Sequence, residues 1–311
     1  MRLKNLLLAG LLLMGLIISC GNKENKNNKS EKYNEYVRFY NEIKDGKLNK
    51  FHSVYIQNFS DDDLNFKEPD EAGINAVSGL NPDIEYLDKI IDKMKKEVKK
   101  NPEFKELDKS LEEFLNAMDN EKSLMNEIVS YYKNGEYKKD NFEKGKQLHQ
   151  KYMEANIKSA GKYIVYSENM EKYANKLSEE ELKEMKSKGS EAGYYMSKFI
   201  SDIKAFSNKL YQSEEGEFSE EDIAELKKLN QTAKETYNNW IKVKGERIGK
   251  EGYKLDEYVK FRASSENIIN SMDNLMKYVE EKSDDLYPQS QKFSVSFDKF
   301  IDDYNGIIGK K

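Results

Sequence analysis

The sequence predicts an all-α protein, an elongated bundle of about seven to eight long antiparallel amphipathic helices. Apolar residues recur at alternating steps of three and four, the spacing that places them on one face of a helix. No segment alternates apolar and polar residues by two, as a half-buried strand would. The chain has four prolines in 311 residues, so long stretches lack the strongest helix breaker.

The first twenty residues resemble the signal sequence and lipobox of a bacterial lipoprotein. A charged start precedes an apolar core over residues 6–18, which is shorter than the roughly 20 residues that a membrane-spanning helix needs. Ile17 stands three positions before Cys20, and the small residue Ser19 stands directly before it. The resemblance implies that residues 1–19 are a signal peptide and that Cys20 is lipidated. The alternative is an ordinary cleaved signal followed by a chance cysteine.

Fatty acyl chains such as palmitate on Cys20 would hold the protein on a membrane, since each buried methylene contributes roughly 0.8 kcal/mol. We therefore expect a membrane anchor and a location in the cell envelope. Gly21, and not aspartate, follows the cysteine, which makes the outer membrane the preferred location. Cys20 is also the single cysteine of the chain, so no intrachain disulfide is possible.

Residues 20–32 are expected to form the lipidated cysteine and a flexible polar tether. The segment 21–32 contains no apolar side chain and contributes nothing to a core. As a flexible coil it would span on the order of 20 Å. Its lysines provide an alternative role, a weak attraction to anionic lipid.

A helical domain is expected over residues 33–311. The predicted helices are 31–59, 83–100, 102–133, 140–176, 179–213, 220–249, 254–283 and 288–308, with a possible break at Asp45-Gly46. Start signals are Asn81-Pro82, Asn101-Pro102, and the capping boxes that begin at Ser178 and Ser219.

Apolar stripes identify the residues expected to face the core. They are Ile84, Leu87, Ile91, Met94 and Val98; Phe104, Leu107, Leu111, Phe114 and Met118; Leu255, Tyr258, Ile269, Met272, Met276 and Val279; and Phe293, Phe297, Phe300 and Tyr304. The many tyrosines, 21 in all, suit the boundary of a bundle that is short of aliphatic residues, although they are also compatible with an aromatic binding surface.

Residues 60–82 form the one long irregular connection that the sequence predicts. Such loops are uncommon unless they are functional or disordered, so Asp61, Asp62 and Asp63 are the candidate partner contact. The aspartates do not continue into a calcium loop, because Phe66 replaces its glycine and Ala72 its closing glutamate.

The sequence contains no recognisable catalytic or metal-binding motif. Neither His52 nor His149 has a glutamate three residues before it, which disfavours zinc proteases and di-iron bundles. Catalytic glycine-flanked serines and phosphate-binding glycine loops are also missing. We expect no catalytic residues, no metal and no cofactor, so an enzyme is the less favoured reading.

Composition restricts the class of partner. The formal net charge is −5, and loss of residues 1–19 removes two positive charges and leaves −7. Nucleic acid is therefore not an expected partner. With 35% charged residues and a mean hydropathy of −0.91, the remainder of the chain provides no second membrane segment.

Three segments rich in tyrosine, asparagine and lysine stand near the start, in the middle and at the end of the chain, at 32–41, 131–149 and 300–305. They resemble the YiiG-like family of bacterial lipoproteins, which is catalogued as a domain of unknown function. The resemblance covers essentially the whole mature chain. It implies a helical envelope lipoprotein and carries over no catalytic residues.

Two functions remain open at this point. The favoured one is a lipid-anchored, non-catalytic cell-envelope module that binds or scaffolds a protein or cell-wall partner. The alternative is an envelope hydrolase using dispersed carboxylates, which need no contiguous motif. A solute-binding lipoprotein is disfavoured, since its strands would alternate with helices.

Overall fold

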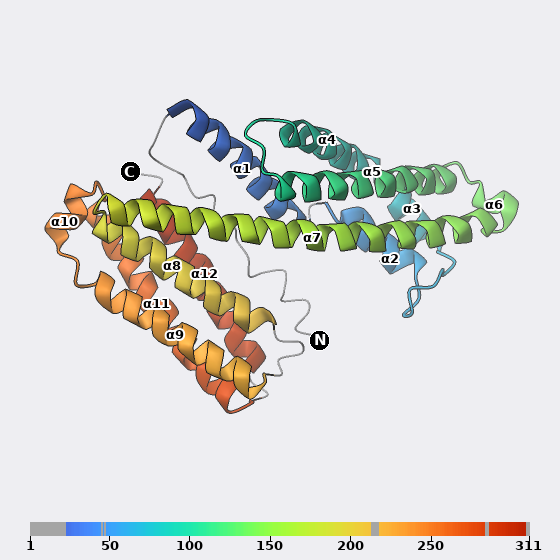
Figure 1. Ribbon diagram of the computed structural model, residues 1–311. Coiled ribbons are helices and arrows are strands. Elements are labelled where there is room, and N and C mark those ends of the chain that lie inside the picture. The colour runs from blue at the N-terminus through green and yellow to red at the C-terminus, as the bar shows by residue number, and fades with distance from the viewer. Residues whose placement is uncertain (1–22, 45, 47, 213–217, 284–285, 309–311) are drawn as a thin grey trace. The chain divides into compact units, whose positions relative to one another are not determined.

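The computed structural model describes residues 23–44, 46, 48–212, 218–283 and 286–308 (Figure 1). The predicted signal peptide and Cys20 lie outside these residues. The all-α fold is confirmed: the described residues form no strand, and one isolated β-bridge joins Ser60 to Phe66.

The helices are α1 (Lys23–Lys44), α2 (Lys50–Phe59), α3 (Glu71–Ser78), α4 (Asn81–Val98), α5 (Glu106–Lys133), α6 (Tyr137–Asp140), α7 (Glu143–Ser187), α8 (Glu191–Gln212), α9 (Glu220–Trp240), α10 (Gly245–Lys250), α11 (Leu255–Glu280) and α12 (Leu286–Ile308). The described chain thus has more helices than predicted. Short helices such as α3, α6 and α10 lie between the long ones, and the predicted helix 31–59 is divided into α1 and α2.

The region expected to be one helical domain contains two compact units. Among the described residues, the N-terminal unit ends at Ala174 and the C-terminal unit begins at Asn175. The boundary falls within α7. Each unit has its own buried core and is described by itself.

The core of the N-terminal unit is built largely from aromatic rings. The predicted stripes of α4 and α5 are buried, apart from the half-buried Val98 at the end of α4. On α1, Phe39 packs its ring 6.1 Å from that of Phe114, and the buried Tyr166 of α7 donates a hydrogen bond to the Tyr36 carbonyl at 3.2 Å. Tyrosine is therefore a core residue here.

The C-terminal unit packs α8, α9, α11 and α12 around Trp240. The Trp240 ring lies 5.9 Å from Phe199 and 5.1 Å from Phe261, and the predicted stripe of α12 is buried. Two expectations on α11 are wrong. Leu255 is 60% exposed because it starts the helix, and Ile268 is fully buried whereas Ile269 only packs against the edge of the core.

The two predicted capping boxes have different outcomes. Ser219 caps α9 as predicted, with reciprocal hydrogen bonds to Asp222. Ser178 lies inside α7, so the predicted break there is wrong. No glycine or proline interrupts the chain near Ser178. Helix α7 continues to Ser187, two residues before Gly189, which adopts the positive φ of +67° common where helices end.

Residues 23–32 of the predicted tether are helical, since α1 starts at Lys23. Lysine and glutamate extend a helix readily once it is nucleated, and the packed part of α1 provides that nucleus. The second Asn-Pro signal is also wrong as a helix start. The Asn101–Pro102 bond is cis, and α5 begins only at Glu106.

Candidate functional site

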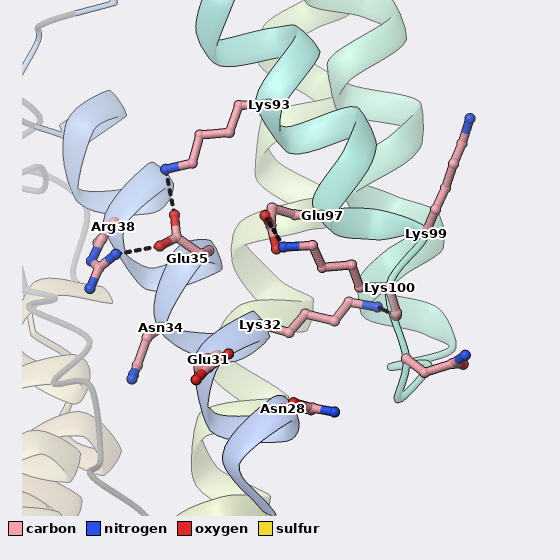
Figure 2. A pocket seen from close by; sticks show the side chains of 11 residues that line it. Asn28, Glu31, Lys32, Asn34, Glu35, Arg38, Lys93, Glu97, Lys99 and Lys100 are labelled. Atoms are coloured by element: carbon pink, nitrogen blue, oxygen red, sulfur yellow. Dashed lines mark hydrogen bonds and ion pairs between the residues drawn. The ribbon is translucent and has the colours of Figure 1, made fainter. Parts of the chain in front are cut away.

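A polar pocket of about 730 Å³ opens on the N-terminal unit between α1 and the end of α4 (Figure 2). From α1 it is lined by Asn28, Glu31, Lys32, Asn34, Glu35 and Arg38. From α4 and the residues that follow it, the lining is Lys93, Glu97, Lys99, Lys100 and Asn101. No apolar side chain takes part, so the pocket suits a hydrophilic ligand.

The inner wall of the pocket is held by Lys32, which is only 1% exposed. Its ammonium donates to the carbonyls of Val98, Lys100 and Pro102 at 3.0, 2.7 and 3.1 Å. It also donates to Asp108 Oδ2 at 2.8 Å. The residues after α4 therefore wrap around a charged group, and this explains why α5 does not start at Pro102.

Asp108 completes this cluster from the first turn of α5. Its carboxylate accepts hydrogen bonds from the Tyr36 hydroxyl at 2.7 Å and from the Phe104 backbone N–H at 2.8 Å. Burial, and then the hydrogen bond to Asp108, raise the pKa of Tyr36 well above its usual range. Tyr36 is thus a neutral donor, and every charge in this cluster has a partner.

Carboxylates at the rim of the pocket are paired with cations. Lys93 and Arg38 both contact Glu35, and Lys100 Nζ lies 2.6 Å from Glu97 Oε1 (Figure 2). The hydrogen bond that Lys100 donates to Glu97 raises the pKa of Lys100. In Figure 2, Lys99 points away from both pairs.

The pocket carries more positive than negative groups. It has five basic side chains against three glutamates. Asp108 neutralises Lys32, so the remaining lining has a formal excess of one positive charge. Two of those glutamates are held in ion pairs, and the lining contains no cysteine, serine or histidine. The arrangement can bind an acidic or zwitterionic polar ligand, and its described lining presents no thiol, hydroxyl or imidazole group.

The predicted contact residues Asp61, Asp62 and Asp63 lie elsewhere in this unit, in the loop after α2, and all three are exposed. The Asp61 side chain accepts the backbone N–H groups of Asp63 at 3.0 Å and Asn65 at 2.8 Å. These hydrogen bonds lower the pKa of Asp61, and the bond from the Asn65 N–H has the largest effect. Asp61 therefore closes a turn, while Asp62 and Asp63 remain at the surface.

The loop 60–82 is more ordered than the sequence indicates. His149 of α7 donates from Nε2 to the Leu64 carbonyl at 3.0 Å and accepts at Nδ1 from Tyr55. The second half of the loop contains α3, and Asp70 caps the N-terminus of this helix. At Gly73 a side chain would approach Asn58 Cβ to 2.9 Å, so α3 requires glycine to pack this closely.

A buried acid lies apart from the pocket lining. Glu121 of α5 accepts a hydrogen bond from Asn156 Nδ2 at 2.8 Å, and burial raises its pKa. Tyr152 links Glu121 to His52, whose Nδ1 lies 3.2 Å from the Tyr152 hydroxyl. This cluster has acid–base character, yet Glu121 and Tyr152 are both buried.

The described residues hold no candidate metal site and no candidate membrane span. No group of three or more histidine, cysteine, aspartate or glutamate side chains is arranged to hold a metal ion in that part of the chain. Of the helices described, none combines the length and the apolar character needed to cross a membrane.

A protein family described as "Protein of unknown function (DUF3829)" matches residues 27–306. The chain belongs to the DUF3829 family. The DUF3829 match contains every residue of the pocket and also Asp61, Asp62 and Asp63, whereas Cys20 precedes it. No significant match was found among curated proteins or among solved structures.

The sequence alone did not reveal the pocket of this DUF3829 domain. Lys32 stands in a polar segment whose composition predicts a flexible tether. Its hydrogen-bond partners are 66 to 76 positions away in the sequence. One signal is visible in retrospect: Lys32 immediately precedes the stripe of buried residues that begins with Tyr33 and Tyr36. A lysine at the edge of a buried helical face is often held by a carboxylate.

Proposed function

We propose that this DUF3829 protein is a lipid-anchored, non-catalytic cell-envelope module that binds a protein or cell-wall partner through the charged pocket of its N-terminal unit. Cys20 would carry the lipid, as the lipobox-like sequence Ile17-Ile18-Ser19-Cys20 suggests. The finer identity as a YiiG-like lipoprotein of the outer membrane is part of this proposal.

The observation that carries the proposal is the closeness in sequence between the pocket and Cys20. Asn28, the first lining residue, is eight positions after Cys20. Even a fully extended chain of that length spans at most about 29 Å. A lipid on Cys20 would hold the pocket near a membrane surface, where it would meet ligands of the envelope.

The chemistry of the pocket supports a partner that carries carboxylates. Lys99 and the excess of positive charge attract acidic groups, and the glutamates and asparagines can accept or donate hydrogen bonds to amides and amines. Acidic peptides of a protein or of the cell wall have this composition. The exposed Asp62 and Asp63 offer a second contact, for a basic patch on the same partner.

The alternative of an envelope hydrolase receives less support. General acid catalysis needs a carboxyl group of raised pKa that reaches substrate. Glu121 has the raised pKa but is buried outside the pocket lining. The pocket glutamates Glu35 and Glu97 are instead bound to cations.

The test is capture of partners from intact cells by crosslinking the tagged protein. Lys93→Glu with Lys99→Glu should reduce capture, because the double change makes the pocket acidic. The matched control is Lys277→Glu with Lys292→Glu, two exposed helical lysines of the C-terminal unit. If the pocket variant captures every partner at the yield of the control, the pocket is not the binding site.

A further inference from the structure

The solvent side of α7 carries an apolar stripe in the N-terminal unit. We define the α7 stripe as Ile157, Gly161, Ile164 and Val165, all of which are exposed, Ile157 to 69%. Steps of four, three and one residue place these four on one face of the helix. Charged residues would normally occupy such a face, so the α7 stripe calls for an explanation.

The α7 stripe faces away from the core of its own unit. The core contacts of α7 come from buried residues such as Tyr152 and Tyr166. At 100° per residue, Tyr152 lies on the side of the helix opposite Gly161, and Tyr166 lies well over 90° away from it. The aliphatic side chains of the stripe therefore do not serve the packing of the N-terminal unit.

Gly161 is the most informative residue of the stripe. It lies near the middle of a 45-residue helix, where glycine is less stabilising than alanine. A Cβ built at Gly161 would have no atom within 4 Å, whereas at Gly145 of the same helix it would meet the Tyr132 hydroxyl at 2.8 Å. The chain itself thus gives no reason for glycine at position 161. A second helix that packs closely there would provide one.

Charges flank the α7 stripe in a self-complementary order. Glu154 precedes the stripe, Lys158 lies beside its first two residues, and Glu168 and Lys172 follow it; all four are exposed. None of the four forms an ion pair within the described part of the chain. Glu154 accepts a hydrogen bond from Gln150 Nε2 at 3.0 Å, but this amide is neutral. The four charges therefore remain available to a partner.

An antiparallel pairing of two α7 helices matches all of these charges at once. If Gly161 faces Val165 of a second copy, Glu154 faces Lys172 and Lys158 faces Glu168 of that copy. A two-fold axis at position 163 generates each of these pairs twice. A parallel pairing in register would instead bring each charge against its like, which is unfavourable.

We propose that the α7 stripe is the docking site for a second copy of this chain, in an antiparallel helix pair centred on position 163. Ile164 and Val165 of each copy pack over Gly161 of the other, and the four charged positions fix direction and register. The contact spans about five helical turns, so the dimer is weak and depends on concentration. This dimer is independent of the pocket and of the proposed lipid.

Sedimentation of the full chain in detergent tests the surface. The wild type should show a concentration-dependent equilibrium between monomer and dimer up to concentrations on the order of 100 μM. Ile164→Lys should raise the dimer dissociation constant by about tenfold or more, since Ile164 packs over Gly161 of the other copy at the centre of the pair, where a charge would lose its water. Val295→Lys is the matched control, because Val295 of α12 is 69% exposed and lies outside the stripe.

A charge swap tests direction and register. Glu154→Lys should weaken the dimer by placing two lysines opposite each other, and adding Lys172→Glu should restore it. Circular dichroism of each variant would establish that the helices are intact. Recovery in the double variant is the result we expect. A double variant as weak as Glu154→Lys overturns the antiparallel register.

Two further results would overturn the surface itself. One is a wild type that stays monomeric throughout the concentration range. In that case, a lowered melting temperature of Ile164→Lys alone would mean that the same chain covers the stripe. The other is an equal dimer dissociation constant for Ile164→Lys and Val295→Lys.

Discussion

Lys32 and Asp108 form an ion pair in the interior of the N-terminal unit, with Nζ 2.8 Å from Oδ2 and side chains 1% and 9% exposed. The pair joins α1 to α5 across 76 positions of sequence. Three backbone carbonyls accept further hydrogen bonds from the Lys32 ammonium. The Tyr36 hydroxyl donates one to the Asp108 carboxylate. Because neither charge is solvated, removal of one partner leaves the other buried and unpaired.

Lys32→Met and Asp108→Asn are each expected to lower the free energy of unfolding by about 3 to 5 kcal/mol. The quantity is measured by urea denaturation followed by circular dichroism. Lys93→Met is the control, because its ion pair with Glu35 lies at the rim, where Lys93 is half exposed. The control should change the free energy by less than about 1 kcal/mol. Equally small changes in the free energy of unfolding for all three variants would contradict a structural role for Lys32.

Glu121 should make stability depend on pH in a defined direction. Burial raises its folded-state pKa above the ordinary value of 4.5, so the folded protein binds the Glu121 proton more tightly than the unfolded chain. That contribution is complete below pH 4.5 and is lost as pH rises through the folded-state pKa.

Glu121→Gln removes this contribution while it retains a side-chain carbonyl that can accept from Asn156. The stability of the wild type relative to the Gln variant should therefore increase as pH falls from 7 toward 4.5. Urea unfolding at a series of pH values measures the difference, in which the effects of other groups cancel. A difference that is constant over this range would contradict the raised pKa.

Asp62→Ser with Asp63→Ser should reduce binding of a basic partner without affecting the fold, and the loss should be greatest at low salt. Asp61 is left unchanged, because its carboxylate closes the turn at Asp63 and Asn65. Capture yields and the melting temperature are the two measurements. If the double variant captures all partners at unchanged yield, the loop serves as a connector only.

The core positions should show a graded response to truncation. Leu111→Ala and Ile268→Ala remove fully buried side chains and should lower the free energy of unfolding by about 2 to 5 kcal/mol. Ile269→Ala should have a smaller effect, since Ile269 only packs against the edge of the core. Leu255→Ala should change it by less than about 0.5 kcal/mol. The reverse order would mean that α11 is rotated about its axis.

Local patterns in the sequence predicted the fold class and the buried faces well. The apolar stripe positions from Ile84 to Met94 and from Phe104 to Met118 are buried. Apolar residues at a helical period all lie on one face of the helix, and that face packs against the core. Ser219 caps α9 because its side chain accepts from the Asp222 backbone N–H while the Asp222 carboxylate accepts from the Ser219 backbone N–H. The same signal at Ser178 failed, since uninterrupted helix formers on both sides favour continuation of α7.

The pocket was not predictable in the same way. Its geometry depends on Lys32 meeting carbonyls and a carboxylate that are distant in sequence, and no local pattern encodes that meeting. The aspartates of the loop were found because they are contiguous, yet the turn made by Asp61 and the contact of His149 with Leu64 again depend on the folded chain. Polar contacts between residues far apart in the sequence are thus the part of the site that the sequence alone does not predict.

The measurement that tests the central claim most directly is incorporation of a labelled fatty acid into the full chain in growing cells, compared between the wild type and Cys20→Ser. Serine lacks the thiol that would accept the lipid. The proposal predicts labelled wild type that sediments with membranes, and an unlabelled variant that does not. Equal incorporation of the label in both proteins would contradict a lipid anchor at Cys20.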